Sequence, residues 1–284
     1  MSIKKVGVAG AGAMGAGIAQ VFAAAGFAVT LYDLSTEQLE KAKAGIEKNL
    51  ADAITRGKAT EADKTNTLTR ITFTTDRNAL VADLIIEAII EKLEPKRELF
   101  SALAAINSSE TILATNTSSI PVTRIARGIP NAPRVVGMHF FNPAHIMKLV
   151  EVIEGAETNP EVALTLKQLC VTIGKIPVMC TDSPGFIVNR VARHYYVESL
   201  KALEERVASK ETIDALMESA GFKMGPFKLM DMVGNDINFA VTSSLFESFH
   251  NDPKFRPSRI QQQKVDAGHL GKKTGKGFYD YPAK

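Results

Sequence analysis

Apolar residues recur with two different periods along the first part of the chain. Val6 and Val8 lie in a short strand-like run, and residues 10–15 form a glycine-rich turn that opens a helix continuing through residues 20–25. Residues 28–32 return to the strand-like pattern. A strand, a glycine turn, a helix and a second strand predict the first βαβ unit of a parallel sheet.

The same rhythm continues to residue 181 with one interruption. A Lys- and Glu-rich helix over residues 36–56 and a looser polar segment come before the next short strand, at residues 71–74. Further on, the pattern predicts helices over residues 95–105 and 122–127, and strands over residues 83–90, 111–115 and 176–181. We therefore expect an α/β fold with a Rossmann-type doubly wound sheet and a helical insertion.

The rest of the chain is predicted to form a smaller, all-α C-terminal domain. The segment DSPG at residues 182–185 is the best candidate for a boundary, which we place between a first domain of residues 1–184 and a second of residues 185–284. Helical spacing of apolar residues then predicts helices over residues 186–206, 210–219 and 235–250.

Composition excludes several classes of partner. The 284 residues are 45% hydrophobic and 23% charged, and the net charge of +3 comes without a polybasic run, so neither nucleic acid nor a membrane surface is expected as a partner. The uncharged run at residues 6–32 is rich in Gly and Ala and breaks into short elements, which argues against a targeting or transmembrane segment. A small ligand of modest charge is expected instead.

Cysteine and histidine usage gives no sign of a metal site. Cys170 and Cys180 are ten residues apart without a CxxC motif, so we expect reduced thiols in a reducing compartment, the cytoplasm. Four histidines are scattered without ligand spacing and are expected to have surface or packing roles: His145, His194, His250 and His269.

The glycine turn predicts a dinucleotide site. In GAGAMG, Gly10 allows the sharp turn, Gly12 lets the backbone approach a pyrophosphate, and Gly15 permits close packing of helix on strand. Ala13 and Met14 lie between them. Asp33 ends the second strand, where a carboxylate binds the adenine ribose hydroxyls and repels a ribose phosphate. No Arg follows it at residues 34–36, so NAD is favoured over NADP.

The segment GMHFFNPAHIMKLVEVI at residues 137–153 predicts a hairpin. If its turn centres near His145, His139 and Glu151 face each other on antiparallel strands. A histidine supported by a carboxylate can act as an acid or a base near neutral pH, while the alternative is a buried histidine that Glu151 only holds in place. Because ligands lie beyond the carboxyl ends of parallel strands, His139 should share one rim with residues that follow neighbouring strands, Glu91, Asn116 and Ser118.

Several separated motifs resemble the short-chain L-3-hydroxyacyl-CoA dehydrogenases, which include the 3-hydroxybutyryl-CoA dehydrogenases, over essentially the whole chain. The motifs are GAGAMGAGIAQ with Asp33, ATNTSSI at 114–120, GMHFFNPAHIMKLVEV at 137–152, DSPGFIVNR at 182–190, MGPFKLMD at 224–231 and GKKTGKGFY at 271–279. The resemblance implies an NAD-dependent, reversible oxidation of (S)-3-hydroxyacyl-CoA with a short acyl chain to 3-ketoacyl-CoA. It also implies a homodimer formed through the helical domain.

The resemblance further assigns roles to residues. It makes His139 the general base and Glu151 the group that orients it, while Ser118 and Asn189 would hydrogen-bond the reacting oxygen or the thioester. It also implies a set of cofactor contacts: Gly10, Gly12, Ala13, Met14, Gly15, Asp33, Glu91, Lys96, Asn116, Ser118 and Asn142.

The CoA nucleotide is expected on the helical insertion. Asn49, Arg56 and Lys58 are candidates for its phosphates, with a solvated charged face as the alternative. The turn NPAHIMK departs from the family where two small or proline residues are usual, so His145 either shapes substrate preference or has no role.

Two other functions stay open at this point. The chain could be an NAD-binding protein without catalysis, but a structural protein has no need to keep Ser118, His139, Glu151 and Asn189 together. It could also oxidise a free hydroxy acid or sugar acid, but such substrates require a concentrated cationic site, and only Arg190 lies beside the catalytic motifs.

Overall fold

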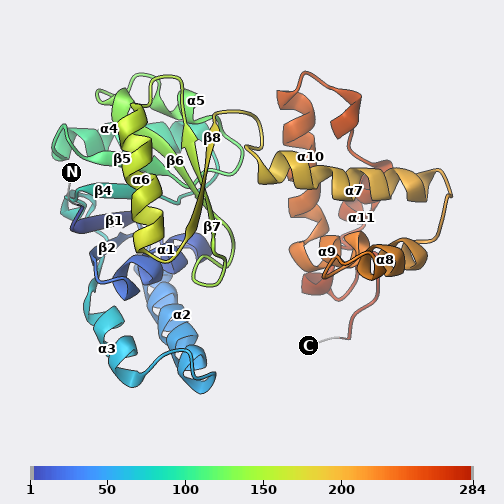
Figure 1. Cartoon of the computed structure of the whole chain (residues 1–284), viewed down its shortest axis with the longest axis horizontal. Coiled ribbons are helices and arrows are strands. Elements are labelled where there is room, and N and C mark those ends of the chain that lie inside the picture. The colour runs from blue at the N-terminus through green and yellow to red at the C-terminus, as the bar shows by residue number, and fades with distance from the viewer. Residues whose placement is uncertain (1–2, 283–284) are drawn as a thin grey trace. The chain divides into compact units, whose positions relative to one another are not determined.

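A computed structural model describes residues 3–282 (Figure 1). The chain divides into two compact units that meet at Ser183 and Pro184, one residue before the predicted boundary. The first unit holds an eight-stranded sheet and the second is helical.

The sheet of the first unit is doubly wound, as the sequence predicts. Its strand order is β3-β2-β1-β4-β5-β6-β7-β8, and every neighbouring pair is parallel except β6 and β7. The strands are β1 (Lys5–Ala9), β2 (Ala28–Tyr32), β3 (Ile71–Thr74), β4 (Leu84–Glu87), β5 (Ile112–Thr115), β6 (Val135–Phe140), β7 (Leu149–Glu154) and β8 (Ile176–Thr181). The central strands are buried along their whole length, which is typical of parallel strands covered on both faces.

Six α-helices accompany the described part of this sheet. They are α1 (Ala13–Ala24), α2 (Thr36–Thr55), α3 (Glu61–Thr69), α4 (Leu93–Ile106), α5 (Val122–Ala126) and α6 (Pro160–Thr172). One continuous apolar core joins α1, α2 and α6 to one face of the sheet, for example through Phe22, Leu31 and Leu166. On the other face, Val122 of α5 packs against Gly137 so closely that a side chain there would meet it at 3.0 Å.

The helical insertion is a helix pair rather than a helix and a loop. The polar segment after α2 forms α3, which begins at a capping box in which Thr60 and Asp63 bond each other's backbone amides. Figure 1 shows α2 and α3 side by side at one end of the first unit. The expectation of an irregular segment at this position was wrong.

The second unit contains five α-helices among the described residues. They are α7 (Val188–Glu204), α8 (Lys210–Ser219), α9 (Pro226–Val233), α10 (Asn235–Ser248) and α11 (Arg259–Asp266). Leu200, Phe227, Met230 and Phe278 form a fully buried apolar cluster that joins α7 and α9 to the C-terminal segment.

Asp231 anchors that C-terminal segment. Its carboxylate is fully buried and accepts hydrogen bonds from the amides of Phe278 and Tyr279 at 2.8 and 2.9 Å and from the Tyr281 hydroxyl at 3.0 Å. Gly277 passes so close that a Cβ would lie 2.0 Å from Asp231 Oδ1. Only glycine fits there, which explains one glycine of the GKGFY motif.

The helices, the length of β4, the membrane and the metal ligands each bear on the sequence-based expectation. Helices α6, α9 and α11 were not predicted, and β4 is shorter than expected because the chain leaves the sheet after Glu87. Within residues 3–282, no helix is long and apolar enough to cross a membrane. No cluster of three or more potential metal ligands occurs in the same range.

Candidate active site

The β6–β7 hairpin brings His139 and Glu151 together. The two residues are direct partners in the antiparallel ladder, which confirms the predicted register. His139 Nδ1 lies 2.8 Å from Glu151 Oε2, and both side chains are buried, at 6% and 1% exposure. A carboxylate on Nδ1 selects the tautomer with its proton on that nitrogen, so proton exchange with a ligand falls to Nε2.

Ser118 and Glu91 meet at the carboxyl ends of the neighbouring strands. Glu91 Oε1 accepts the backbone amides of Ser118 and Ser119 at 2.8 and 3.0 Å and the hydroxyl of Thr117 at 2.7 Å. The hydroxyls of Ser118 and Ser119 also point to this oxygen, at 3.2 and 3.1 Å. Glu91 therefore fixes the whole turn that carries Ser118.

Lys96 is buried beneath Glu91 and reaches a second carboxylate. Its ammonium lies 3.1 Å from Glu91 Oε2 and 2.6 Å from Glu87 Oε1. Partial burial alone would raise the pKa of Glu91, but the charge of Lys96 and the hydrogen bonds from the turn outweigh it and lower that pKa to about 2. Glu91 is thus ionised at any physiological pH.

Asn116 links the end of β5 to the end of β6. Its Oδ1 accepts the amide of Phe140 at 2.8 Å, directly after His139. The four residues expected on one rim, Glu91, Asn116, Ser118 and His139, thus lie at the ends of adjacent strands β4, β5 and β6.

The glycine turn has the geometry that a dinucleotide requires. Gly10 has a φ of 101°, and a Cβ on Gly15 would lie 1.7 Å from the Gly10 carbonyl oxygen, so neither position admits a side chain. Helix α1 begins after Gly12 without a side-chain cap, which leaves its first amides for an anionic ligand. Met14 packs against the core.

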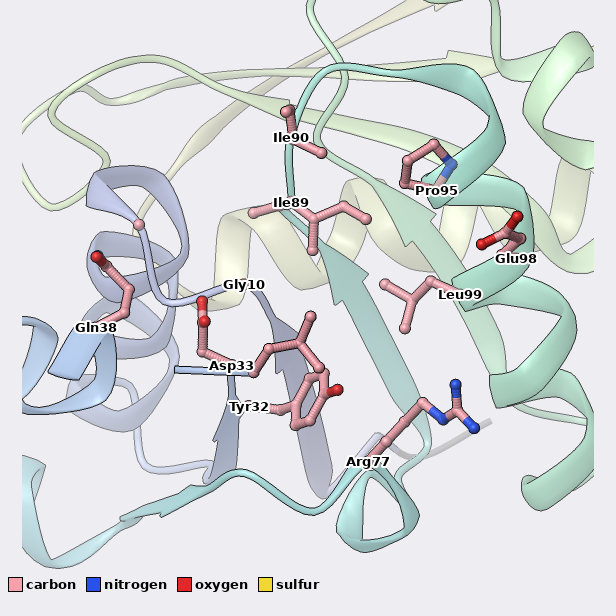
Figure 2. A pocket seen from close by; sticks show the side chains of 13 residues that line it. Gly10, Tyr32, Asp33, Gln38, Arg77, Ile89, Ile90, Pro95, Glu98 and Leu99 are labelled. Atoms are coloured by element: carbon pink, nitrogen blue, oxygen red, sulfur yellow. The ribbon is translucent and has the colours of Figure 1, made fainter. Parts of the chain in front are cut away.

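Asp33 lies at one end of a cavity of about 580 Å³ beside this turn (Figure 2). Asp33 Oδ2 accepts the amide of Ala11 at 2.7 Å and Oδ1 accepts that of Ser35 at 3.0 Å. Figure 2 shows Asp33 and Gln38 at one side of the cavity and Leu99 and Arg77 at the other. These walls fit an adenosine, because a ribose can reach the carboxylate while the base lies against apolar side chains.

A second cavity of about 310 Å³ lies on the other side of the glycine turn. Asn49 of α2, Asn142 and His145 line it together with Gly12 and Ala13. The amide of Asn49 donates to Gln20 Oε1 at 3.2 Å. Burial and the charge of Lys175 lower the pKa of His145, which favours the neutral form of its ring.

Arg56, Lys58 and Asn189 were also predicted to contact the substrate, but none of them lines either of the two cavities. Arg56 caps the C-terminal end of α2, and both Arg56 and Lys58 are exposed. Asn189 lies in the first turn of α7 and so belongs to the second unit.

Sequence reasoning missed two residues of this region. Glu87 is fully buried at the end of β4, and Arg77 lines the Asp33 cavity from the short helix at Arg77–Ala79. An acidic residue closing the apolar run LIIE was a signal for Glu87. Nothing local marks Arg77, because its place depends on how β3 and β4 lie in the sheet.

Family models cover nearly the whole chain. Residues 5–183 match the model described as 3-hydroxyacyl-CoA dehydrogenase, NAD binding domain, and residues 185–281 match the one described as 3-hydroxyacyl-CoA dehydrogenase, C-terminal domain. The chain belongs to the 3-hydroxyacyl-CoA dehydrogenase family. The predicted family, fold class and NAD as cofactor are thereby confirmed.

Known members of the family resemble the chain along its full length. It is 52% identical to the 3-hydroxyadipyl-CoA dehydrogenase of Escherichia coli (strain K12) over 285 residues, which are 100% of this chain but 60% of that protein. It is 43% identical to a probable 3-hydroxybutyryl-CoA dehydrogenase of Bacillus subtilis (strain 168), covering 100% of this chain and 99% of that protein. The crystal structure of (S)-3-hydroxybutyryl-CoA dehydrogenase from Ralstonia eutropha has a TM-score of 0.96 at 39% identity, with 99% of this chain and 100% of that one covered.

Proposed function

We propose that this family member catalyses the NAD-dependent, reversible oxidation of (S)-3-hydroxyacyl-CoA to 3-ketoacyl-CoA. The observation that carries the proposal is the buried His139–Glu151 pair on the rim of an NAD-binding domain. Hydride transfer requires a bound nicotinamide, one proton acceptor and hydrogen-bond donors toward a carbonyl. On this rim, His139 can be the proton acceptor and Ser118 can be a donor.

His139 acts as the general base. Its Nε2 takes the proton of the 3-hydroxyl while the hydrogen on C3 leaves as hydride, so the alcohol becomes a ketone. NAD supplies the hydride acceptor when bound. The Glu151 carboxylate at 2.8 Å keeps the other proton on Nδ1 and stabilises the imidazolium that forms.

Ser118 and Asn189 orient the substrate. A hydroxyl or amide N–H donated to the reacting oxygen stabilises the negative charge that grows on it during reduction of the ketone. Glu91 supports this role for Ser118, because it fixes the backbone on both sides of the hydroxyl.

Short acyl chains are the proposed substrates. Relatives of the chain are named for 3-hydroxybutyryl-CoA and for 3-hydroxyadipyl-CoA, which are esters of four- and six-carbon acids. The two differ at the end of the acyl group, where the second carries a carboxylate.

Oxidation of NADH by the purified protein tests the proposal. Rapid turnover with acetoacetyl-CoA and NADH, and little with free acetoacetate or with NADPH, is the expected result. Turnover with free acetoacetate instead would favour a hydroxy-acid dehydrogenase. Tight NADH binding without turnover on either the four-carbon or the six-carbon ester would favour an NAD-binding protein without catalysis.

The CoA nucleotide is proposed to lie along α2. Asn49 lines the cavity beside the glycine turn, and Arg56 and Lys58 add positive charge at the end of the same helix. Substitution of Arg56 by Met should raise KM for acetoacetyl-CoA more than for a pantetheine ester that lacks the nucleotide. Equal changes for both esters would remove Arg56 from the phosphate site.

We further propose a homodimer formed through the helical unit. This unit exposes large apolar side chains that a monomer would leave in water: Val191, Leu216, Phe222, Met232, Val233 and Ile237. Sedimentation should give twice the chain mass of 30.7 kDa. A monomer at micromolar concentration would overturn this part of the proposal.

The cytoplasm is the proposed location. Cys170 and Cys180 are free thiols, and burial raises the pKa of both to about 12, so they stay protonated and resist oxidation. Alkylation during cell lysis should find both thiols reduced.

A further inference from the structure

We propose that Glu87 is a positioning residue for hydride transfer, acting through Lys96 and Glu91 on the hydroxyl of Ser118. This inference rests on the proposed function. It assigns a role to a buried carboxylate that the general-base chemistry of His139 does not use.

Glu87 is fully enclosed and fully hydrogen-bonded. It ends β4 on the face that α4 covers, with an exposure of 0%. Its Oε1 accepts the amide of Ile89 at 2.8 Å and the ammonium of Lys96 at 2.6 Å, and its Oε2 accepts the hydroxyl of Thr115 at 2.7 Å. All of these partners lie at or just after the carboxyl ends of β4 and β5, on the same rim as Ser118.

Lys96 transmits the position of Glu87 to Glu91. The Lys96 side chain is 1% exposed, and its ammonium bridges Glu87 Oε1 and Glu91 Oε2. An ammonium between two carboxylates is held from both sides. Without the charge on Glu87, the same ammonium is attracted by Glu91 alone and moves toward it.

Glu91 then sets the availability of the Ser118 hydroxyl. Five donors share Glu91 Oε1, more than its lone pairs can satisfy well. The Ser118 hydroxyl makes the longest of these contacts, 3.2 Å, while the amide of Ser118 makes a short one of 2.8 Å. The carboxylate therefore holds the backbone firmly and releases the hydroxyl at little cost to a substrate oxygen.

Stability alone does not account for this network. Burying the Glu87 carboxylate and the Lys96 ammonium, which are 0% and 1% exposed, costs desolvation free energy, and apolar side chains of similar volume often serve folding equally well. Burial raises the pKa of Glu87 against the opposing charge of Lys96, which reflects the same cost. Positioning of Ser118 would explain why these charged groups are buried here.

A double-mutant cycle tests the proposal. We expect Glu87→Gln to lower kcat for acetoacetyl-CoA about tenfold, as loss of positioning does, with the Kd for NADH changed less than about twofold. In a Ser118→Ala background, the same substitution should have almost no further effect, because both changes act through one hydroxyl. The proposal would be overturned if Glu87→Gln lowered kcat as much in the Ser118→Ala background as in the wild type. It would also be overturned if Glu87→Gln weakened NADH binding by the same factor as it lowered kcat.

A measurement without substrate separates this proposal from the proposed function. In Glu87→Gln the Lys96 ammonium moves toward Glu91 and competes with the N–H groups of Ser118 and Ser119 for that carboxylate. Amide hydrogen exchange at these two residues should therefore accelerate. Glu94→Gln is the matched control, since it removes an exposed carboxylate from the same helix α4 and should change neither exchange nor kcat. Unchanged exchange in Glu87→Gln would refute the positioning role even if the wild-type protein did not reduce acetoacetyl-CoA.

Lys96→Met keeps the test decisive if Glu87→Gln does not fold. Glu87 can then take up a proton and stay buried as a neutral acid, because burial already raises its pKa. The same lower kcat is expected at saturating NADH, a condition needed because Lys96 is itself a predicted cofactor contact, and the same absence of a further effect is expected in Ser118→Ala. The proposal would also be overturned if Lys96→Met lowered kcat as much in the Ser118→Ala background as in the wild type.

Discussion

Neighbouring atoms, rather than residue type, set the charge state of the carboxyl groups on the rim. Burial raises the pKa of Glu87, while Lys96 and the turn amides lower that of Glu91 to about 2, although only four positions separate the two residues. The difference follows from solvent access and from the number of N–H donors that each carboxylate accepts. One network therefore shifts the pKa values of two neighbouring carboxyl groups in opposite directions.

His139→Gln tests the base directly. Glutamine fills a similar volume but cannot take up a proton near neutral pH, so kcat should fall about a thousandfold, within the range for removal of a general base. The Kd for NADH, measured by fluorescence, should persist. An active variant would remove His139 from the mechanism.

Glu151→Gln should separate orientation from binding. A neutral amide stabilises the imidazolium less well than a carboxylate at 2.8 Å, so kcat should fall about a hundredfold while NADH affinity changes little. The circular dichroism spectrum serves as the control for folding. Equal losses of kcat and of NADH affinity would point to disruption of the hairpin instead.

Asp33→Ala should narrow the gap between NADH and NADPH. The change removes the ribose contact, which should raise the Kd for NADH about tenfold, and it removes the repulsion of a ribose phosphate in a cavity that Arg77 also lines. Titration of both cofactors by fluorescence measures the ratio. An unchanged ratio would mean that Asp33 does not contact the ribose.

Some of the site could be predicted from single residues and some could not. The His139–Glu151 pairing follows from spacing about a turn, and Asp33 follows from its place after β2, because both depend on local geometry. The Glu87–Lys96 contact joins the end of a strand to a helix, and only tertiary packing decides that both side chains are buried. From the sequence, Lys96 was expected only as a cofactor contact, and that expectation came from the family resemblance rather than from local geometry.

At the scale of elements, the helices that were not predicted have capping residues or short lengths rather than a long apolar periodicity. Helix α6 begins with Asn159 as its cap, Pro160 in its first turn and Glu161 after it, a usual start of a helix. Helix α3 has a capping box but almost no buried apolar residue, so its periodicity is weak. Helices α9 and α11 have only eight residues each, which is short for a periodic pattern.

Asp231→Asn should destabilise the helical unit selectively. An amide cannot accept all the hydrogen bonds from Phe278, Tyr279 and Tyr281, so the free energy of unfolding of this unit should fall by about 2 kcal/mol. Urea unfolding followed through tyrosine fluorescence would measure it. Asp280→Asn, in the same C-terminal segment but 85% exposed, is the matched control and should have no effect. Equal stability of the two variants would contradict the anchoring role.

For the whole molecule, Glu91 should make the NAD-binding unit sensitive to acid. Its pKa is about 2 in the folded protein against an ordinary value of 4.5, so its contribution to stability is complete above pH 4.5 and is lost as the pH falls toward 2. The gap in free energy of unfolding between wild type and Glu91→Gln should therefore be wide at pH 7 and narrow below pH 4.5. Urea titrations between pH 7 and pH 2.5 measure the gap, and a constant difference would contradict the low pKa.

The single antiparallel pair in the sheet also bears on how the protein folds. His139 and Glu151 are 12 positions apart, whereas the contact of Lys5 with Asp83 beside β1 and β4 closes 78 positions. Short loops cost less entropy to close and form faster than long ones. The His139–Glu151 pair therefore belongs to a segment of low contact order, and pulse-labelling during refolding should find the β6–β7 amides protected no later than those of the central parallel strands.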